Sequence, residues 1–119
     1  MIKNTESSPR FFNTSKGKYK LEPDEVYYVE SDKPDHRNKN AVLKGGQKIK
    51  LMNYAFDELL DYFTDLRQAT ISILVAKSLI ISVNGRLLGI DNRKIKSIPT
   101  ELECGGEFVN NFKIKLLIN

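Results

Sequence analysis

The feature that most constrains the fold is a series of short apolar runs, rich in β-branched and aromatic residues, that are separated by turn-forming residues. The run EVYYVE at residues 25–30 is typical of a strand. Paired glycines and Asn-Gly supply the positive φ angles that tight hairpin turns need. Further runs of this kind are KYKLE (18–22), NAVLK and QKIKLM around Gly45–Gly46, ATISILVA, LIISV and RLLGI around Asn84–Gly85, KIKSIP, and TELEC and EFVNN around Gly105–Gly106. We therefore predict a mainly antiparallel β-domain.

A single stretch, NYAFDELLDYFTDL at residues 53–66, has helical periodicity. Its apolar residues recur three and four positions apart, which predicts one buried helix face. Asn53 is a suitable N-cap, and the acids of the first turn favour the N-terminal end of the helix dipole. The fold class is therefore α+β, mainly β with one clear helix. The residues expected to pack on a sheet are Phe56, Leu59, Leu60 and Phe63.

The length of 119 residues fits one domain with a core of its own. Residues 1–17 are polar and predict a flexible lead-in, although Phe11 and Phe12 could dock, and residues 18–119 form the predicted domain. The ending FKIKLLIN fits a short helix or an edge strand. The chain has no apolar run long enough to span a bilayer, and its first residues lack an apolar signal segment. We therefore expect a cytoplasmic protein without membrane contact.

The residue inventory restricts the chemistry available to the chain. Cys104 and His36 are the only cysteine and the only histidine, so an internal disulfide and a Cys/His metal cluster cannot form. A nucleophile–histidine pair would have to recruit His36 from the polar segment SDKPDHRNKN. The phosphate-binding glycine motifs of nucleotide enzymes are absent. We therefore expect no enzymatic activity, no cofactor and no metal site.

The charges are arranged in blocks around a net charge of +4. Residues 33–50 carry six Lys or Arg and one acid, residues 51–65 carry four acids and no base, and residues 66–96 again carry six bases and one acid. Such blocks usually mark a solvated surface, but they also suit a basic side that faces a polyanion, opposite an acidic helix face.

Three stretches resemble the LytTR DNA-binding domain of bacterial transcription regulators. DEVYYVES (24–31) is similar to the first signature strand of that family, GGQKIKLMNYAFDELLDYF (45–63) to its hairpin and helix, and VAKSLIIS (75–82) to its basic-Ser segment. The chain lacks the aromatic residue, Arg and His that the family commonly places before that segment, and GRLLGIDNRKIKSI (85–98) is a competing match. The resemblance implies an elongated stack of antiparallel β-sheets.

The resemblance also implies that loops, rather than a recognition helix, reach the major groove of double-stranded DNA. Arg and Lys can donate to guanine, Asn can bond adenine, and Lys and Ser suit phosphate oxygens. The loop after the first signature strand and the segment after the helix must then lie on the same side of the molecule. The residues at the matching positions are His36, Arg37, Asn38, Lys39, Lys77, Ser78, Asn110, Asn111 and Lys113.

The function that the resemblance implies is sequence-specific binding of double-stranded DNA by a bacterial transcription regulator. A homodimer on repeated half-sites and a separate sensor or receiver protein stay open as further partners. The residues alone also allow a non-enzymatic basic β-rich module that binds an acidic protein or single-stranded nucleic acid. An exposed apolar patch would favour the protein-binding module, and exposed aromatic side chains on one sheet face would favour the single-strand binder.

Overall fold

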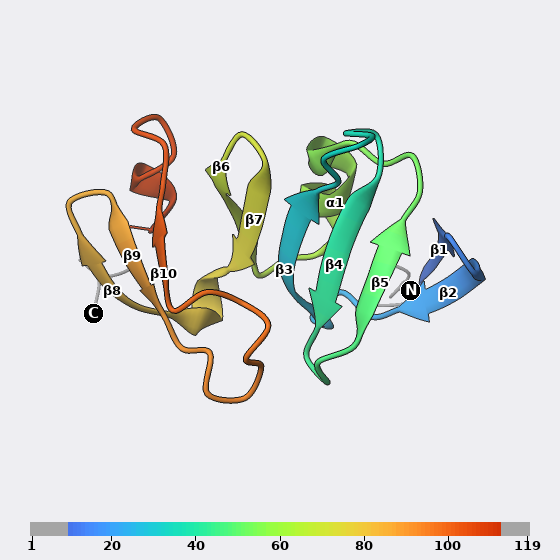
Figure 1. The fold of residues 1–119 in the computed structure, drawn as a ribbon, viewed down its shortest axis with the longest axis horizontal. Helices are drawn as coiled ribbons and strands as arrows, with labels where there is room; N and C mark the ends of the chain where they lie inside the picture. Colours follow the sequence, from blue (N-terminus) through green and yellow to red (C-terminus); the bar gives the residue numbers. More distant parts are fainter. Residues whose placement is uncertain (1–9, 113–119) are drawn as a thin grey trace, which may run out of the picture.

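The computed structural model describes residues 10–112, which form two antiparallel sheets and one short α-helix (Figure 1). The predicted fold class is therefore confirmed. The larger sheet has seven strands in the order β2-β1-β5-β4-β3-β7-β6, and the smaller sheet has three in the order β10-β9-β8. The elements are β1 (Arg10–Thr14), β2 (Gly17–Leu21), β3 (Val26–Ser31), β4 (Lys39–Leu43), β5 (Lys48–Leu51), α1 (Phe56–Tyr62), β6 (Leu66–Thr70), β7 (Ile73–Ala76), the 3-10 helix η2 (Lys77–Leu79), β8 (Ile80–Asn84), β9 (Leu87–Ile90) and β10 (Glu101–Glu103).

Strand β1 lies where the sequence predicts part of a flexible lead-in. It pairs with β2 along its length and meets β5 at Thr14. The ring of Phe12 is buried and stacks on Phe63, with the ring centroids 5.3 Å apart, while Phe11 points to solvent on the other side of the strand. Burial of one aromatic side chain on this scale accounts for the order of an otherwise polar segment.

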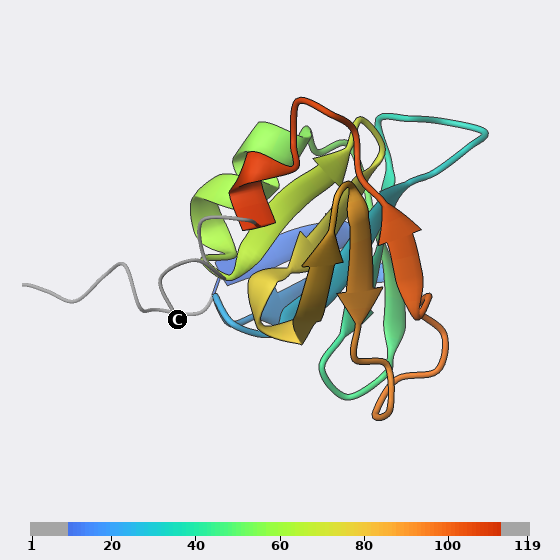
Figure 2. The same ribbon diagram turned by 90° about the vertical axis from the view of Figure 1, so that its left-hand side faces the viewer.

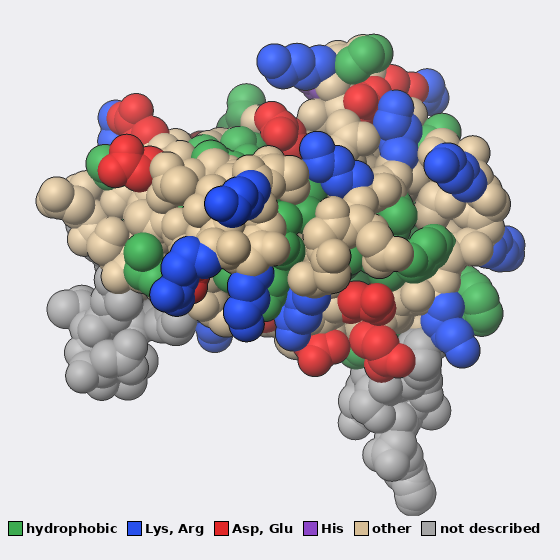
Figure 3. Space-filling view, turned by 60° about the horizontal axis from the view of Figure 1, so that its bottom comes forward, with side chains coloured by type: hydrophobic (Ala, Val, Ile, Leu, Met, Phe, Trp, Pro, Cys, Tyr) green, Lys and Arg blue, Asp and Glu red, His purple; other side chains and the backbone are tan. Residues whose placement is uncertain are grey.

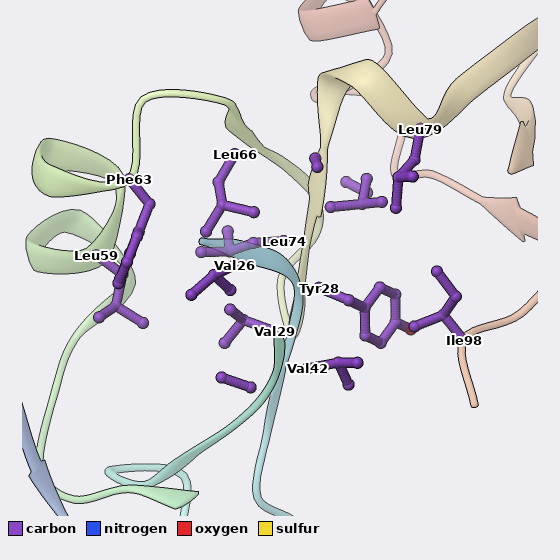
Figure 4. Packing of buried hydrophobic residues seen from close by; sticks show 14 of the residues in the cluster. Val26, Tyr28, Val29, Val42, Leu59, Phe63, Leu66, Leu74, Leu79 and Ile98 are labelled. Carbon is purple, nitrogen blue, oxygen red and sulfur yellow. The ribbon is translucent and has the colours of Figure 1, made fainter. Parts of the chain in front are cut away.

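Strand β3 divides the core into two halves. Val26 and Val29 point toward α1, whereas Tyr28 points to the opposite side, toward Val42 and Ile98 (Figure 4). The two valines share a side because a β-bulge shifts the register between Val26 and Tyr28. Burial, together with the nearby Glu30 carboxylate, raises the pKa of Tyr28 to about 12.

Helix α1 covers the back of the larger sheet (Figure 2), and its predicted packing face is confirmed. Leu59 and Phe63 are fully buried, and Phe56 and Leu60 pack at their margin. The helix begins later than the sequence predicts. Its N-cap is Ala55, whose backbone N–H donates to the Glu58 carboxylate at 2.8 Å.

Asn53, the predicted N-cap, instead adopts a φ of 69° before the helix. Its backbone N–H donates to the Asn38 side chain at 3.1 Å. Asparagine tolerates this left-handed conformation better than most residues, so Asn53 forms the bend that leads into the helix instead of capping it.

Three predictions about strands differ from the structure. The run ATISILVA forms two strands, β6 and β7, that are joined at Ile71–Ser72. The predicted strand KIKSIP is an irregular loop, because Ile95 and Ile98, three residues apart, are both buried. The predicted hairpin of TELEC with EFVNN is also wrong.

Strand β10 pairs with β9 instead, and the chain after Gly105 makes turns and then a helical turn that begins at Asn110. Phe112 is buried at the end of this segment, and the remainder of FKIKLLIN lies outside the described residues. None of the helices within residues 10–112 is long and apolar enough to cross a membrane.

Candidate nucleic-acid interface

The ends of the strands of the larger sheet, with the turns and loops that follow them, form two opposite margins of the molecule (Figure 1). We call these margins edges, although they are not the outermost strands. The predicted contact residues are divided between them. At one edge, Ser31 at the end of β3 donates its N–H to the carbonyl of Ser72, in the turn between β6 and β7, at 2.9 Å. We call this the upper edge. Because β7 is antiparallel to β3, it leads to the other end of the sheet, the lower edge, where the β4–β5 turn, η2 and the loop 91–99 lie.

Three segments form a row along the upper edge, as both Figure 1 and Figure 2 show. The first is the loop 32–38, and the second is the Ile71–Ser72 turn. The third is the segment 104–111, which hydrogen bonds tie to β6. The N–H of Gly105 donates to the carbonyl of Ala69, and the side-chain amide of Asn111 donates to the carbonyl of Gln68, both at 2.9 Å.

The loop 32–38 presents His36 and Arg37 to solvent. Backbone hydrogen bonds close the loop from Asp32 N–H to the Asn38 carbonyl, at 3.0 Å, and from Asn38 N–H to the Asp35 carbonyl, at 2.9 Å. The backbone N–H of Arg37 also donates to the Asp35 carboxylate. A loop closed in this way holds its exposed side chains in a defined place.

The guanidinium of Arg37 is clamped by the Asp35 carboxylate. Its Nε donates to Oδ1 at 3.1 Å and its Nη2 to Oδ2 at 2.9 Å, while 76% of the Arg37 side chain stays exposed. The hydrogen bonds from Arg37 lower the pKa of Asp35 to about 2. The clamp uses the Nε side of the guanidinium, so the Nη1 end is left to meet an acceptor from outside.

Asn38 and Lys39, two further predicted contacts, point toward the protein. Asn38 accepts the N–H of Asn53, as described above. Lys39 is only 5% exposed, its ammonium donates to the carbonyl of His36, and its Nζ lies 5.3 Å from the centre of the Phe56 ring. Burial lowers the pKa of Lys39. These two residues therefore hold the loop against the start of α1.

A hollow of about 550 Å³ adjoins this loop, and its lining includes His36, Arg37, Tyr54 and Glu58. Cys104 is buried at the start of the segment 104–111 and does not line this hollow. Within residues 10–112 no three His, Cys, Asp or Glu side chains gather as a metal site.

The other two segments of the upper edge contribute Asn110 and Asn111, which are exposed, and Ile71, which is 81% exposed at the tip of its turn. The Thr70 hydroxyl accepts the N–H of Ser72 at 3.0 Å and fixes this turn. The sequence did not single out Ile71, because ATISILVA is typical of one continuous strand. Lys113 lies outside the described residues.

Lys77 and Ser78 lie in η2 at the lower edge. The backbone N–H of Lys77 donates to the Asp65 carbonyl at 2.7 Å, and that of Ser78 to the Asp65 carboxylate at 3.1 Å. The structure therefore places His36 and Arg37 along the same edge as the asparagines of the third segment, but it places Lys77 at the opposite end of β7. This arrangement differs from the expectation that the loop after the first signature strand and the segment after the helix lie on the same side of the molecule.

Comparison with known proteins adds a likeness in fold. No family model and no curated protein matches the sequence. Among solved structures, the chain is similar to one described as the LytTr DNA-binding domain of a methyl-accepting/DNA response regulator from Bacillus cereus, with a TM-score of 0.61 and 15% sequence identity over 92% of this chain and 96% of that chain. At this identity the likeness concerns the fold. The chain has the LytTR fold that its signature-like stretches predict.

Proposed function

We propose that this chain binds double-stranded DNA in a sequence-specific manner, as the DNA-binding domain of a bacterial transcription regulator, and that the upper edge makes the contacts. One observation carries the proposal. The fold brings the loop 32–38 and the segment 104–111, distant in sequence, into one row with exposed side chains that can bond base edges. The LytTR fold supports the same function.

The roles follow from the hydrogen-bonding groups of each side chain. Arg37, clamped by Asp35, can donate its free end to guanine, and Asn110 can bond adenine in the major groove. His36, beside Arg37, can contact a base or a phosphate. Asn111 keeps its side-chain oxygen available, because only its amide nitrogen bonds the Gln68 carbonyl. We assign Asn38 and Lys39 to positioning the loop, and we keep Lys113 as a proposed phosphate contact.

The two alternatives receive less support from the described surface. The exposed large apolar side chains come from four separate elements, namely β1, the β6–β7 turn, β8 and β9, which is normal for a soluble protein. They are Phe11, Ile71, Ile81 and Leu87. Phe11 is the one aromatic residue among them, whereas a single-strand binder needs several exposed rings on one face.

The test begins with selection of a preferred site from a random duplex library. Arg37→Ala should lower affinity for the selected site by about 1–3 kcal/mol and lower affinity for a scrambled duplex less. Arg93→Ala is a matched control, because Arg93 is clamped by Asp91 in the same geometry in the lower-edge loop. Equal discrimination by both variants, or no preferred site, would contradict the proposal. Two copies of the selected motif about one helical turn apart would indicate a homodimer.

A second variant distinguishes two roles for Asp35, because each role predicts a different change in DNA binding. Asp35→Ala removes a negative charge close to the proposed DNA surface, so Coulomb attraction alone predicts tighter binding. If Asp35 orients Arg37, the same variant should instead reduce discrimination between the selected and the scrambled duplex. Fluorescence anisotropy at several salt concentrations measures both quantities.

A further inference from the structure

A row of lysines crosses the face that contains the lower edge. These residues are exposed, and within the described part of the chain they form no ion pair with a carboxylate. Figure 3, which brings this face forward, shows Lys and Arg side chains spread across it. We call this set the basic band: Lys16, Lys18, Lys48, Lys94 and Lys96.

Three hollows connect four members of the basic band, which come from separate elements, and Lys96 lies in the same loop as Lys94. Lys94 and Ser78 line one hollow, between η2 and the loop 91–99. Ser97 of the same loop shares a second hollow with Lys48, and Lys48 shares a third with Lys16 and Lys18. The band is therefore continuous from the smaller sheet to the β1–β2 hairpin.

Several acids near the basic band already have partners, and Figure 3 shows Asp and Glu side chains on the same face as the lysines. The Glu25 carboxylate accepts the backbone N–H of Glu22. Asp91 is paired with Arg93 at 2.8 Å, and Asp24 with Lys44 at 3.6 Å. The Asp65 carboxylate accepts the N–H of Ser78. Glu30 lines the hollow of Lys48, but its strand register places it at the level of Lys50, farther up the sheet. The five lysines of the basic band form no ion pair among the described residues, so the band itself is positively charged.

We propose that the basic band binds the sugar–phosphate backbone of a second duplex segment, without reading its sequence, while the upper edge holds the first. The second half of this statement rests on the proposed function. Lysine ammonium groups are mobile point charges that suit phosphate oxygens, and the hydroxyls of Ser78 and Ser97 lie beside them.

The chemistry of the band favours a nucleic-acid backbone over a protein partner. Protein interfaces rely on buried aromatic and apolar anchors and are poor in lysine at their centre. None of the exposed large apolar side chains of the described residues falls within 44–48, 77–79 or 91–99. The band and the upper edge lie at opposite ends of β3 and β7, so the chain can bridge two segments of DNA.

A capture experiment tests the bridge. A duplex with the selected site is immobilised and saturated with protein, and a labelled duplex of unrelated sequence is then added. We expect the wild-type protein to capture the second duplex, and the capture to fall steeply with salt. The double variant Lys48→Gln, Lys94→Gln should capture about tenfold less, because two phosphate contacts are lost, and should hold the first duplex as the wild-type protein does.

The control is Lys20→Gln with Arg86→Gln, which makes the same change in net charge at exposed positions on β2 and in the β8–β9 turn. It should capture the second duplex as the wild-type protein does. Absence of capture by wild-type protein bound to the first duplex, or equal loss in both variants, would overturn the proposal. Displacement of the second duplex by polyglutamate at matched charge would assign the band to an acidic protein and would also overturn it.

The bridge and the proposed function fail in different ways. If the wild-type protein shows no preferred site, the proposed function fails, and binding of the unrelated duplex is then compared directly between the two double variants. Loss of that binding in the Lys48, Lys94 variant alone supports the band as a phosphate-binding surface. Equal binding by both variants overturns it.

Discussion

Two arginines of this chain, Arg37 and Arg93, are held in the same way at opposite edges. Each donates from Nε and Nη2 to the carboxylate two residues earlier, with distances between 2.8 and 3.1 Å. A guanidinium held in this way loses less conformational freedom when it meets a further acceptor. This arrangement is therefore a local consequence of the Asp-x-Arg sequence. What the arginine can contact depends on the edge at which it lies.

The clamp predicts how the chain responds to acid. Hydrogen bonds from Arg93 lower the pKa of Asp91 from 3.8 to about 2. Since the folded-state pKa lies below the unfolded value, the contribution of this pair to stability is present above pH 4 or so and is lost as the pH falls through about 2. Carbon chemical shifts of the Asp91 carboxyl, followed against pH, should show the low pKa. Arg93→Gln should return it toward 3.8, and an unchanged midpoint in that variant would contradict the assignment.

We predict that substitution of Lys39 lowers the stability of the fold, although the sequence predicts a DNA contact for this residue. Its aliphatic stem is buried, and its ammonium satisfies the carbonyl of His36. Lys39→Ala should therefore lower the free energy of unfolding by about 1–3 kcal/mol. Arg37→Ala, in the same loop but exposed, should change it by less than about 0.5 kcal/mol. Urea unfolding of both variants checks this, and equal effects would show that the loop does not depend on Lys39.

For Arg37 and Lys39, the sequence predicts the loop but not the direction of each side chain. The polar composition of 32–40 correctly indicates a loop, but strand β4 begins at Lys39, where the sheet turns the side chain inward. Composition does not reveal this, because the first residue of a strand can face either side. The grouping of Arg37 with Asn110 depends on the strand order β3-β7-β6 and on the bonds from 104–111 to β6, and neither follows from local pattern.

At the scale of single elements, α1 depends on its packing. It has seven residues, too few for a stable helix in water without tertiary contacts. Leu59 and Phe63 supply these contacts, because they lie against the valines of β3 and against Leu66 (Figure 4). The 3.6-residue period predicted the existence and the face of the helix because both follow from burial of a single stripe.

The start of the helix and the loops of the smaller sheet were harder to predict. Asn53 is a good N-cap by residue type, yet the turn that brings the chain from β5 to α1 requires its left-handed conformation. The alternation in KIKSIP is typical of a strand, but Ile95 and Ile98, three residues apart, are both buried in the core. In each case a tertiary contact outweighs the local preference.

The packing of α1 gives a graded prediction. Leu59→Ala should lower the free energy of unfolding by about 2–5 kcal/mol, because it opens a cavity in a fully buried site. Leu60→Ala should cost clearly less, since Leu60 lies at the margin of the core and the site can relax. Chemical denaturation with equal m-values in both variants would allow the comparison. A larger loss of unfolding free energy in Leu60→Ala than in Leu59→Ala would show that the helix turns a different face toward the sheet.

At the scale of the whole molecule, the two sheets meet in an apolar contact region. Tyr28 and Val42 from the larger sheet face Leu79 and Ile98, which lie on the connections that lead into and out of the smaller sheet (Figure 4). The upper edge takes its third segment from the chain that follows β10. Its geometry therefore depends on how firmly the two sheets are held together.

Ile98→Ala tests this dependence. Ile98 is 2% exposed, so its truncation should leave a cavity between the sheets and lower the free energy of unfolding by about 2–4 kcal/mol. Hydrogen exchange should become faster in β8, β9 and β10 than in β3 and β4, because the smaller sheet has fewer strands to hold it in place. The matched control is Ile98→Val, which removes one methylene and should cost about 0.5–1.5 kcal/mol. If exchange in β9 and β10 stays at its wild-type rate while stability falls, the contact between Tyr28 and Ile98 supports the larger sheet alone. Segment 104–111 would then keep its place by means of its hydrogen bonds to β6.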